Sequence, residues 1–112
     1  MDSDRFLPLT PVVLEIAMAL AAGERHGYDI MQDVERRSGG AIVIHPGTLY
    51  RALARMLDQA LIEELDDRRG HDDQRRRYYR LTALGRAVAR AEVERLAGQV
   101  TAGRRLFRGG GA

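Results

Sequence analysis

The sequence has no cysteine, no tryptophan and no lysine among its 112 residues. The lack of cysteine excludes disulfides, thiolate zinc sites and cysteine nucleophiles. Its main apolar run, from Val12 to Ala22, is interrupted by Glu15 and is shorter than the roughly 18 residues that cross a bilayer. The first residues, among them Asp2 and Asp4, lack the basic and apolar segments of a secretion signal. We therefore expect a cytoplasmic protein without a membrane span.

The composition that is present predicts one soluble globular domain with at most a short appendage. Hydrophobic residues make up 45% and charged residues 30% of the chain, both within the ordinary globular range. All 18 basic positions are arginine, although the net charge is only +2. The planar donor fork of arginine suits phosphate and guanine, but a biased genome composition explains the missing lysine equally well.

The first half of the chain reads as helices separated by turns. Thr10 and Pro11 form an N-cap and a first helical position, and the helix that they begin is predicted to continue to Ala22 as a buried element. An amphipathic helix follows over Gly27–Arg37, with Asp33 on its polar side. The short β-branched run 41–44 predicts a brief strand.

A third helix begins at Pro46 and has two distinct faces. Its core-facing stripe consists of Leu49, Leu53, Met56 and Leu57, and its opposite face carries Thr48, Arg51, Ala54, Arg55 and Asp58. Two strands, 61–65 and 78–81, then predict a hairpin whose long charged tip spans residues 66–77.

The sequence pattern of the last helix predicts that the protein forms a dimer. Thr82 is its expected N-cap, and the helical pattern runs to about Leu106. Apolar or small residues recur four, three, four, three and four positions apart, as in the seam of a coiled coil; these are Ala89, Val93, Leu96, Val100, Gly103 and Phe107. Because such a helix is longer than a small domain can cover, we expect it to pair with a second chain. A helix folded back onto its own domain is the alternative, since Gly98 and Gly103 weaken it.

The order of these elements predicts a mainly α fold with a small β-hairpin, namely a winged helix-turn-helix followed by a long dimerisation helix. We expect a DNA-binding domain over 1–81, the dimerisation helix over 82–108 and a disordered tail over 109–112. In this fold the third helix enters the major groove, which makes double-stranded DNA the expected partner.

The exposed face of the third helix holds the candidate DNA contacts. Arg51 and Arg55 stand one turn apart, where each could bind a guanine edge or a phosphate, although solvated surface charge is the alternative. Thr48 and the helix N-terminus can donate to a phosphate. Tyr50, at the edge of the core stripe, either reaches the DNA backbone or is a half-buried core residue.

Two arginine clusters flank the acidic centre of the predicted hairpin tip. Such a wing can rest on phosphates or place an arginine in the minor groove, and a merely soluble loop is the alternative. The candidate contacts are Arg68, Arg69, Arg75, Arg76 and Arg77.

Three segments carry a family resemblance: LTPVVLEIAMALAAGERHGYDIM, HPGTLYRALARMLDQALIEE and RRRYYRLTALGR. Together they resemble the PadR family of bacterial transcriptional regulators over about residues 7–96, and the single C-terminal helix resembles the family's shorter subgroup. The His-Gly-Tyr, Pro-Gly-Thr-Leu-Tyr and Tyr-Arg-Leu-Thr motifs are fairly specific, whereas helix-turn-helix order is generic.

The resemblance implies a homodimer held by its C-terminal helices, usually a repressor that releases its operator in response to a small molecule. For this protein we predict a pseudo-palindromic operator. The resemblance also implies that four motif residues lie near DNA, namely Tyr28, Thr48, Tyr50 and Arg51, and that Gly27 and Gly85 are structural. His45 departs from the family, which often has a small capping residue there, so His45 is expected to contact phosphate instead. Some short members of the family bind flat aromatic ligands between tryptophans at the dimer interface, and this chain has no tryptophan. Phe107 and aliphatic residues are therefore the candidate lining of an effector site.

Two other functions compete with this interpretation. An enzyme or metal site is not expected, because the three histidines, His26, His45 and His71, lie on different elements and no nucleophile motif is present. No cofactor is expected either. A winged-helix adaptor that binds protein without specific DNA binding is the stronger rival, although Arg51 and Arg55 argue against it, since such surfaces more naturally present apolar anchors.

Overall fold

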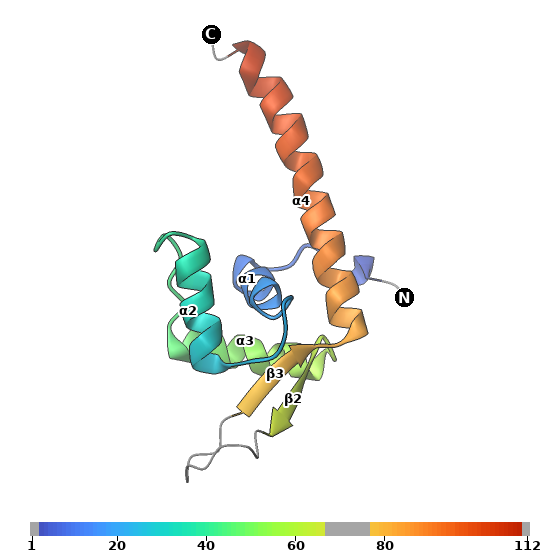
Figure 1. Ribbon diagram of the computed structural model, residues 1–112. Helices are drawn as coiled ribbons and strands as arrows, with labels where there is room; N and C mark the ends of the chain where they lie inside the picture. The colour runs from blue at the N-terminus through green and yellow to red at the C-terminus, as the bar shows by residue number, and fades with distance from the viewer. Residues whose placement is uncertain (1–2, 67–76, 111–112) are drawn as a thin grey trace.

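The computed structural model describes residues 3–66 and 77–110 of the chain. A short 3-10 helix, η1 (Asp4–Phe6), precedes α1 (Pro11–Ala19), β1 (Arg25–His26), α2 (Gly27–Arg37) and α3 (Pro46–Asp58). The strands β2 (Ile62–Asp66) and β3 (Arg77–Leu81) follow, and α4 (Ala83–Gly110) ends the described chain. Figure 1 shows α1, α2 and α3 gathered beside the small sheet, with α4 projecting away from them. This is the predicted winged helix-turn-helix with a long C-terminal helix.

The predicted helix starts are confirmed by their caps. The hydroxyl of Thr10 accepts a hydrogen bond from the backbone N–H of Val13 at 3.2 Å, and Pro11 is the first residue of α1. The hydroxyl of Thr82 accepts one from the N–H of Gly85 at 2.9 Å. Each cap satisfies a helix N–H that would otherwise have no partner within the helix.

The core is formed by the three short helices, the sheet and the first turns of α4. Ile16, Ile30, Leu49 and Val88 are buried members of one hydrophobic cluster contributed by four helices. Of the stripe predicted on α3, Leu49, Leu53 and Met56 are fully buried and Leu57 packs partly buried against the cluster. Burial of this stripe fixes α3 with its opposite face outward.

The sheet contains a strand that the sequence does not predict. It is antiparallel with the order β1-β3-β2, and β1 pairs Arg25 with Tyr79 and His26 with Tyr78. The strand predicted over residues 41–44 is wrong. There the hydroxyl of Ser38 accepts from the N–H of Ile42 at 2.9 Å, so the loop satisfies its backbone locally instead of in a ladder.

Two predicted helix ends are also corrected. Helix α1 ends at Ala19 instead of Ala22, because the Arg25 side chain donates to the Ala19 carbonyl at 2.7 Å and the chain turns at Gly23. Helix α4 runs to Gly110, past the end expected near Leu106 and into the stretch 109–112 expected to be disordered. Glycine is a poor helix former but does not terminate a helix as proline does.

Asp33 lies on the buried side of α2 rather than the predicted polar side, with 5% of its surface exposed. Arg36 and Arg37 donate to its carboxylate at 2.7 and 2.6 Å, and Arg25 lies 3.4 Å away. Burial opposes ionisation, but the hydrogen bond and charge of Arg37, with the charges of Arg25 and Arg36, outweigh it, so the pKa of Asp33 is lowered. The buried carboxylate thereby ties β1 to α2.

The base of α4 is held tightly against the turn that ends α3. A methyl group in place of the Gly85 hydrogen would lie 1.8 Å from the carbonyl oxygen of Leu61. The same carbonyl accepts the N–H of Thr82 at 3.1 Å, and the Thr82 hydroxyl donates to the Ala60 carbonyl at 2.6 Å. The structural role that the resemblance implies for Gly85 follows from this close approach.

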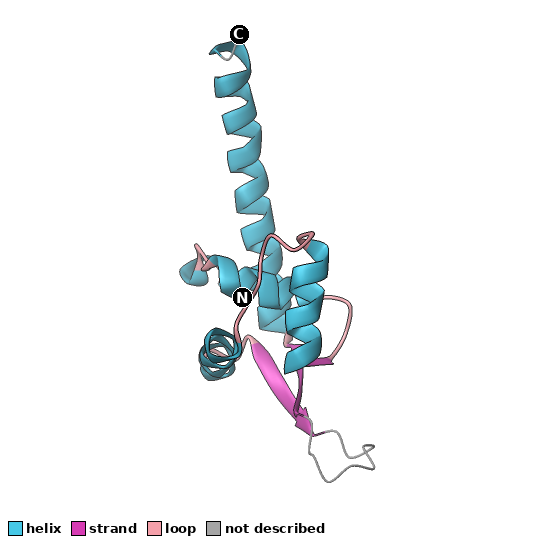
Figure 2. Ribbon diagram, turned by 90° about the vertical axis from the view of Figure 1, so that its left-hand side faces the viewer, coloured by secondary structure: helices cyan, strands magenta, loops and turns pink. Residues whose placement is uncertain are grey.

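A second buried carboxylate ties α4 to the segment before α1. Glu92 is 1% exposed, and its carboxylate accepts the N–H of Leu9 at 2.9 Å and two donors of Arg95. The Arg95 hydrogen bond lowers the pKa of Glu92, against the opposing effect of burial. Beyond this point α4 leaves the domain, because residues 97–108 are exposed except for Gly103, which is half-buried (Figure 2).

Candidate nucleic-acid interface

The outward face of α3 is the centre of the candidate site. Arg51 and Arg55 are both exposed, on the side opposite the buried stripe, and Thr48 is half-buried near the start of the helix. The structure thus brings together the side chains that the sequence places on one face of a recognition helix. Two guanidinium groups one turn apart match the spacing at which a helix can contact base edges and phosphates in a major groove.

The N-terminus of α3 adds positive potential to this face. His45 is exposed and stands at the N-cap, but its side chain makes no capping hydrogen bond, as its departure from the family pattern suggested. A guanidinium nitrogen of Arg51 lies 3.4 Å from where a methyl group on Gly47 would sit, so this side chain covers the first turn. Uncapped N–H groups and a guanidinium at a helix N-terminus favour an anion such as a phosphate.

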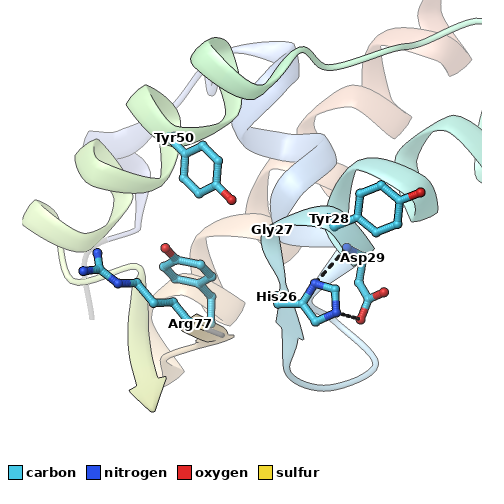
Figure 3. Close-up of a pocket in the computed structure, with 7 residues that line it drawn as sticks. His26, Gly27, Tyr28, Asp29, Tyr50 and Arg77 are labelled. Atoms are coloured by element: carbon cyan, nitrogen blue, oxygen red, sulfur yellow. Dashed lines mark hydrogen bonds and ion pairs between the residues drawn. The ribbon is translucent and has the colours of Figure 1, made fainter. Parts of the chain in front are cut away.

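Tyr50 connects α3 to the start of α2. A methyl group on Gly27 would lie 2.5 Å from the Tyr50 hydroxyl and 3.3 Å from a methyl carbon of Leu49, so the Tyr50 ring can lie here only because residue 27 has no side chain. Half of the Tyr50 surface remains exposed, and Figure 3 shows its ring directed toward Gly27. Tyr50 is therefore both a packing residue and an exposed hydroxyl group.

The start of α2 contributes Tyr28 and His26. Tyr28 is exposed, and its hydroxyl accepts a hydrogen bond from Gln32 at 3.0 Å. The Nδ1 atom of His26 accepts the N–H of Asp29 at 3.3 Å, while its Nε2 atom lies 3.1 Å from the Asp29 carboxylate (Figure 3). The ring also meets Tyr78 edge-on at 5.3 Å between centroids.

His26 is a site residue that sequence reasoning missed, because histidine is not among the residues usually preferred at a helix N-cap. Its two nitrogens face different partners: Nδ1 accepts from the backbone N–H of Asp29, and Nε2 faces the Asp29 carboxylate. Histidine directly before the first helical residue is the signal in the sequence that could have indicated a cap.

The base of the wing completes the site. Arg77 on β3 is exposed and lies 3.4 Å from Glu64 of β2. It lines a hollow of about 640 Å³ together with Tyr50, Tyr79 and the first residues of α2 (Figure 3). The other predicted wing contacts, Arg68, Arg69, Arg75 and Arg76, lie outside the described residues.

The residues predicted for dimerisation lie far from this face, along α4 (Figure 1). Val93, Val100 and Phe107 are exposed, whereas Ala89, Leu96 and Gly103 are half-buried. No described helix is both long and apolar enough to span a membrane. Within residues 3–66 and 77–110, no three histidine, aspartate or glutamate residues are grouped to hold a metal ion.

Residues 14–91, well over half of the chain, match the transcriptional regulator PadR-like family. The chain belongs to this family. As a PadR-like protein it is a DNA-binding transcriptional regulator and not an enzyme. This assignment agrees with the order of its elements and with the two-faced α3. Membership also favours the regulator over the winged-helix adaptor.

Curated relatives of this PadR-like regulator match it over parts of their length. A 37.1 kDa protein of a Streptomyces fradiae transposon is 36% identical over 88 residues, 76% of this chain and 24% of that protein. Protein X of Lysinibacillus sphaericus is 34% identical over 64 residues, 57% of this chain and 58% of that protein. The chain thus spans little more than half of one relative and about a quarter of the other.

Solved structures share the fold more completely. A transcriptional regulator from Clostridium thermocellum has a TM-score of 0.74 at 26% identity, covering 84% of this chain and 87% of that one. Bacillus subtilis PadR, solved in complex with operator DNA, has a TM-score of 0.68 at 22% identity, covering 77% of this chain and 48% of that one.

Proposed function

We propose that this PadR-like regulator is a homodimeric repressor that binds a pseudo-palindromic operator and releases it in response to a small molecule. The observation that carries the proposal is the two-faced α3. Its buried stripe fixes the helix against the core, and its outward face presents Arg51 and Arg55. The neighbouring Tyr50 lines a hollow together with the wing residue Arg77.

The proposed contacts divide into base readout and backbone positioning. Arg51 and Arg55 enter the major groove, where each guanidinium can bind a guanine edge. Thr48 and His45 contact a phosphate at the α3 N-terminus. The remaining residues hold the backbone on either side of the groove; they are Tyr28, Tyr50, Arg77 and the wing residues Arg68, Arg69, Arg75 and Arg76.

The proposed dimer uses the exposed apolar seam of α4. A helix of 28 residues is about 42 Å long, and its distal half packs against nothing in its own described chain. Two copies joined there would present two copies of α3 to one duplex. The expected operator has half-sites about one helical turn, roughly 34 Å, apart.

Repression and relief by a small molecule are supported by the family resemblance. If an effector binds at the dimer interface, Phe107 and the aliphatic residues of the seam are the side chains available to line it. Expression of a reporter fused to the upstream promoter tests the direction of regulation: repression predicts higher expression when the regulator is deleted.

DNA binding through α3 is tested by fluorescence anisotropy on duplexes from the region upstream of the regulator's own gene and on scrambled duplexes, at two salt concentrations. The test variant is Arg51→Ala with Arg55→Ala. The matched control is Arg104→Ala with Arg105→Ala, which removes the same charge from an exposed part of α4. Because a base-contacting arginine contributes about 1–3 kcal/mol, the test variant is expected to lose about thirtyfold or more in affinity for the upstream DNA.

The control separates readout from bulk charge. It is expected to lose only the small affinity that follows from two fewer positive charges, and to retain the preference for upstream over scrambled DNA. Equal losses in both double variants would show that α3 does not read the operator. Equal affinity of the wild type for the two duplexes would contradict specific binding to this region.

A further inference from the structure

The hollow of about 640 Å³ described above lies between α3 and the base of the wing (Figure 3). It is lined by Tyr50 of α3, by Arg77 and Tyr79 of β3, and by residues 26–29 at the start of α2. In the proposed complex α3 enters the major groove, and the wing holds the DNA backbone beside it. The sugar-phosphate strand that borders the groove on the wing side therefore passes over this hollow.

The hollow contains a buried hydroxyl group that lacks a partner in the described chain. Tyr79 lines the hollow although only 4% of its surface is exposed. Its hydroxyl makes no hydrogen bond with another residue of 3–66 or 77–110. Buried tyrosine hydroxyls usually have a hydrogen-bond partner. A group that enters the hollow from outside the chain can supply this partner.

The Tyr79 hydroxyl is a donor at neutral pH. Burial, the charge of Glu64 and the neighbouring Tyr50 raise the pKa of Tyr79 above its ordinary value of 10.0, against the opposing effect of Arg77. The phenol therefore stays protonated and can donate to an anionic oxygen, which is the stronger kind of acceptor.

The charges around the hollow favour an anion on the side of Arg77. The guanidinium of Arg77 lies 3.4 Å from Glu64, but this pair is largely exposed, so it contributes little and a phosphate can replace it. The carboxylate of Asp29 also lines the hollow, but it lies away from Arg77 and faces Nε2 of His26 at 3.1 Å (Figure 3). An anion beside Arg77 and Tyr79 thus meets one charged and one neutral donor of the same strand.

We propose that the hollow between α3 and the wing binds a phosphate of the DNA backbone, and that the Tyr79 hydroxyl donates to this phosphate together with Arg77. The inference rests on the proposed operator binding and adds a contact to it. It makes a buried core residue of β3 a part of the DNA-binding surface.

The substitution Tyr79→Phe tests this contact, because it removes the hydroxyl and keeps the buried ring. Affinity is measured by fluorescence anisotropy on the upstream and the scrambled duplexes. Loss of a hydrogen bond to a charged group is expected to lower affinity at least about tenfold. The loss should be equal on the two duplexes, because a phosphate contact carries no sequence information. Wild-type affinity in this variant, or a loss on one duplex only, would contradict the phosphate contact.

Tyr78→Phe is the matched control for the hydroxyl. It makes the same change one residue earlier on β3, where side chains point to the opposite face of the sheet, and Tyr78 is not among the described residues that line the hollow. Its affinity for DNA should change by less than about twofold. Equal losses in the two tyrosine variants would overturn the proposal.

Urea denaturation separates a DNA contact from a structural role of the hydroxyl. Because the Tyr79 hydroxyl bonds no other described residue, Tyr79→Phe should unfold at the wild-type urea midpoint or above it. A lowered midpoint would show that the fold itself needs the hydroxyl, and the proposal would then be wrong.

The salt dependence of binding distinguishes the neutral donor from the charged one. Arg77→Ala removes a charge, so it should reduce the slope of log affinity against log salt concentration by about one for each half-site. Tyr79→Phe removes no charge, so it should lower affinity at every salt concentration and leave the slope unchanged. A reduced slope in Tyr79→Phe would show that charged contacts had shifted, which would contradict a local role of the hydroxyl.

A free anion is a second source of a phosphate group, and inorganic phosphate tests it. Phosphate stabilises folded proteins in general, so equal rises of the urea midpoint are expected in the wild type and in Tyr79→Phe. A larger rise in the wild type would identify a site for a free anion and overturn the assignment to DNA.

The failure of this proposal is distinguishable from that of the proposed function. If the wild type prefers upstream DNA and Tyr79→Phe binds as tightly, the phosphate contact is wrong and operator binding stands. If the wild type binds both duplexes equally, specific binding to this region fails, whereas an equal loss in Tyr79→Phe on both duplexes still supports the contact. If the wild type binds neither duplex, both proposals fail.

Discussion

Replacing Gly85 with alanine should destabilise the protein, although the same change elsewhere in α4 should stabilise it. The added methyl group would lie 1.8 Å from the carbonyl oxygen of Leu61 and 2.8 Å from its carbonyl carbon. Both are backbone atoms, so no side-chain rotation relieves the overlap. Either α4 or the turn before β2 must shift, which strains the Thr82 hydrogen bonds to Leu61 and Ala60.

The size of the effect follows from two opposing contributions. Alanine is favoured over glycine in a helix interior by at most about 1 kcal/mol. Overpacking costs typically about 1–3 kcal/mol, and more where backbone must move. We therefore expect Gly85→Ala to lower the free energy of unfolding by about 2 kcal/mol or more, equivalent to about 8 °C in Tm for a domain of this size.

Gly98→Ala is the matched control because it makes the same chemical change in the same helix. Nothing lies within 4 Å of a methyl group at residue 98, and this position faces away from the seam. It should therefore raise the free energy of unfolding by about 0.5–1 kcal/mol. Both variants are compared with the wild type by urea denaturation at one protein concentration, since dimerisation makes stability concentration-dependent. Equal stability of the two variants would refute the proposed contact between α4 and Leu61.

Two further predictions concern the fastening of α4. Ala60 has a φ of +60° in the turn after α3, and this left-handed conformation costs alanine roughly 1–2 kcal/mol. Ala60→Gly should therefore stabilise the protein by about 0.5–1 kcal/mol. A lower urea midpoint for this variant would contradict the prediction. Folding lowers the pKa of Glu92 below its ordinary 4.5, so the stability that this carboxylate contributes is complete above that value and is lost as the pH falls through the lowered pKa. Glu92→Gln should therefore reduce the fall of the urea midpoint between about pH 5 and pH 3 relative to the wild type, and an unchanged pH profile would show that Glu92 does not titrate as inferred.

The parts of the fold that the sequence predicts are those specified locally. Thr10 with Pro11, and Thr82, are caps whose partners lie three residues away, and the stripe on α3 is a helical repeat. Two of the failures, the missed strand and the buried Asp33, involve partners outside the segment concerned. The two-residue strand Arg25–His26 exists only because β3 lies beside it, and the burial of Asp33 depends on Arg25, eight residues earlier.

The candidate site shows the same division. The outward direction of Arg51 and Arg55 follows from the α3 repeat alone. The close approach of Tyr50 to Gly27 depends on how α2 and α3 meet, which no pattern in one segment specifies. The His26 cap is local, since its partner is the N–H of Asp29, and it was missed because histidine is not among the residues usually preferred at an N-cap. The strand prediction for residues 41–44 failed because of a local contact instead. The β-branched residues match a strand, but the Ser38 side chain already accepts the backbone N–H of Ile42.

In the proposed dimer, the fixed base of α4 determines where each DNA-binding domain lies relative to the other. The direction of α4 relative to α3 is fixed by the Gly85–Leu61 contact and by the Glu92–Leu9 hydrogen bond. In the proposed dimer, the number of residues between this base and the midpoint of the seam therefore sets how far apart, and at what angle, the two copies of α3 stand. One residue inserted there would move each domain by about 1.5 Å and turn it by about 100°. In that dimer, the length of α4 would set the spacing of the operator half-sites.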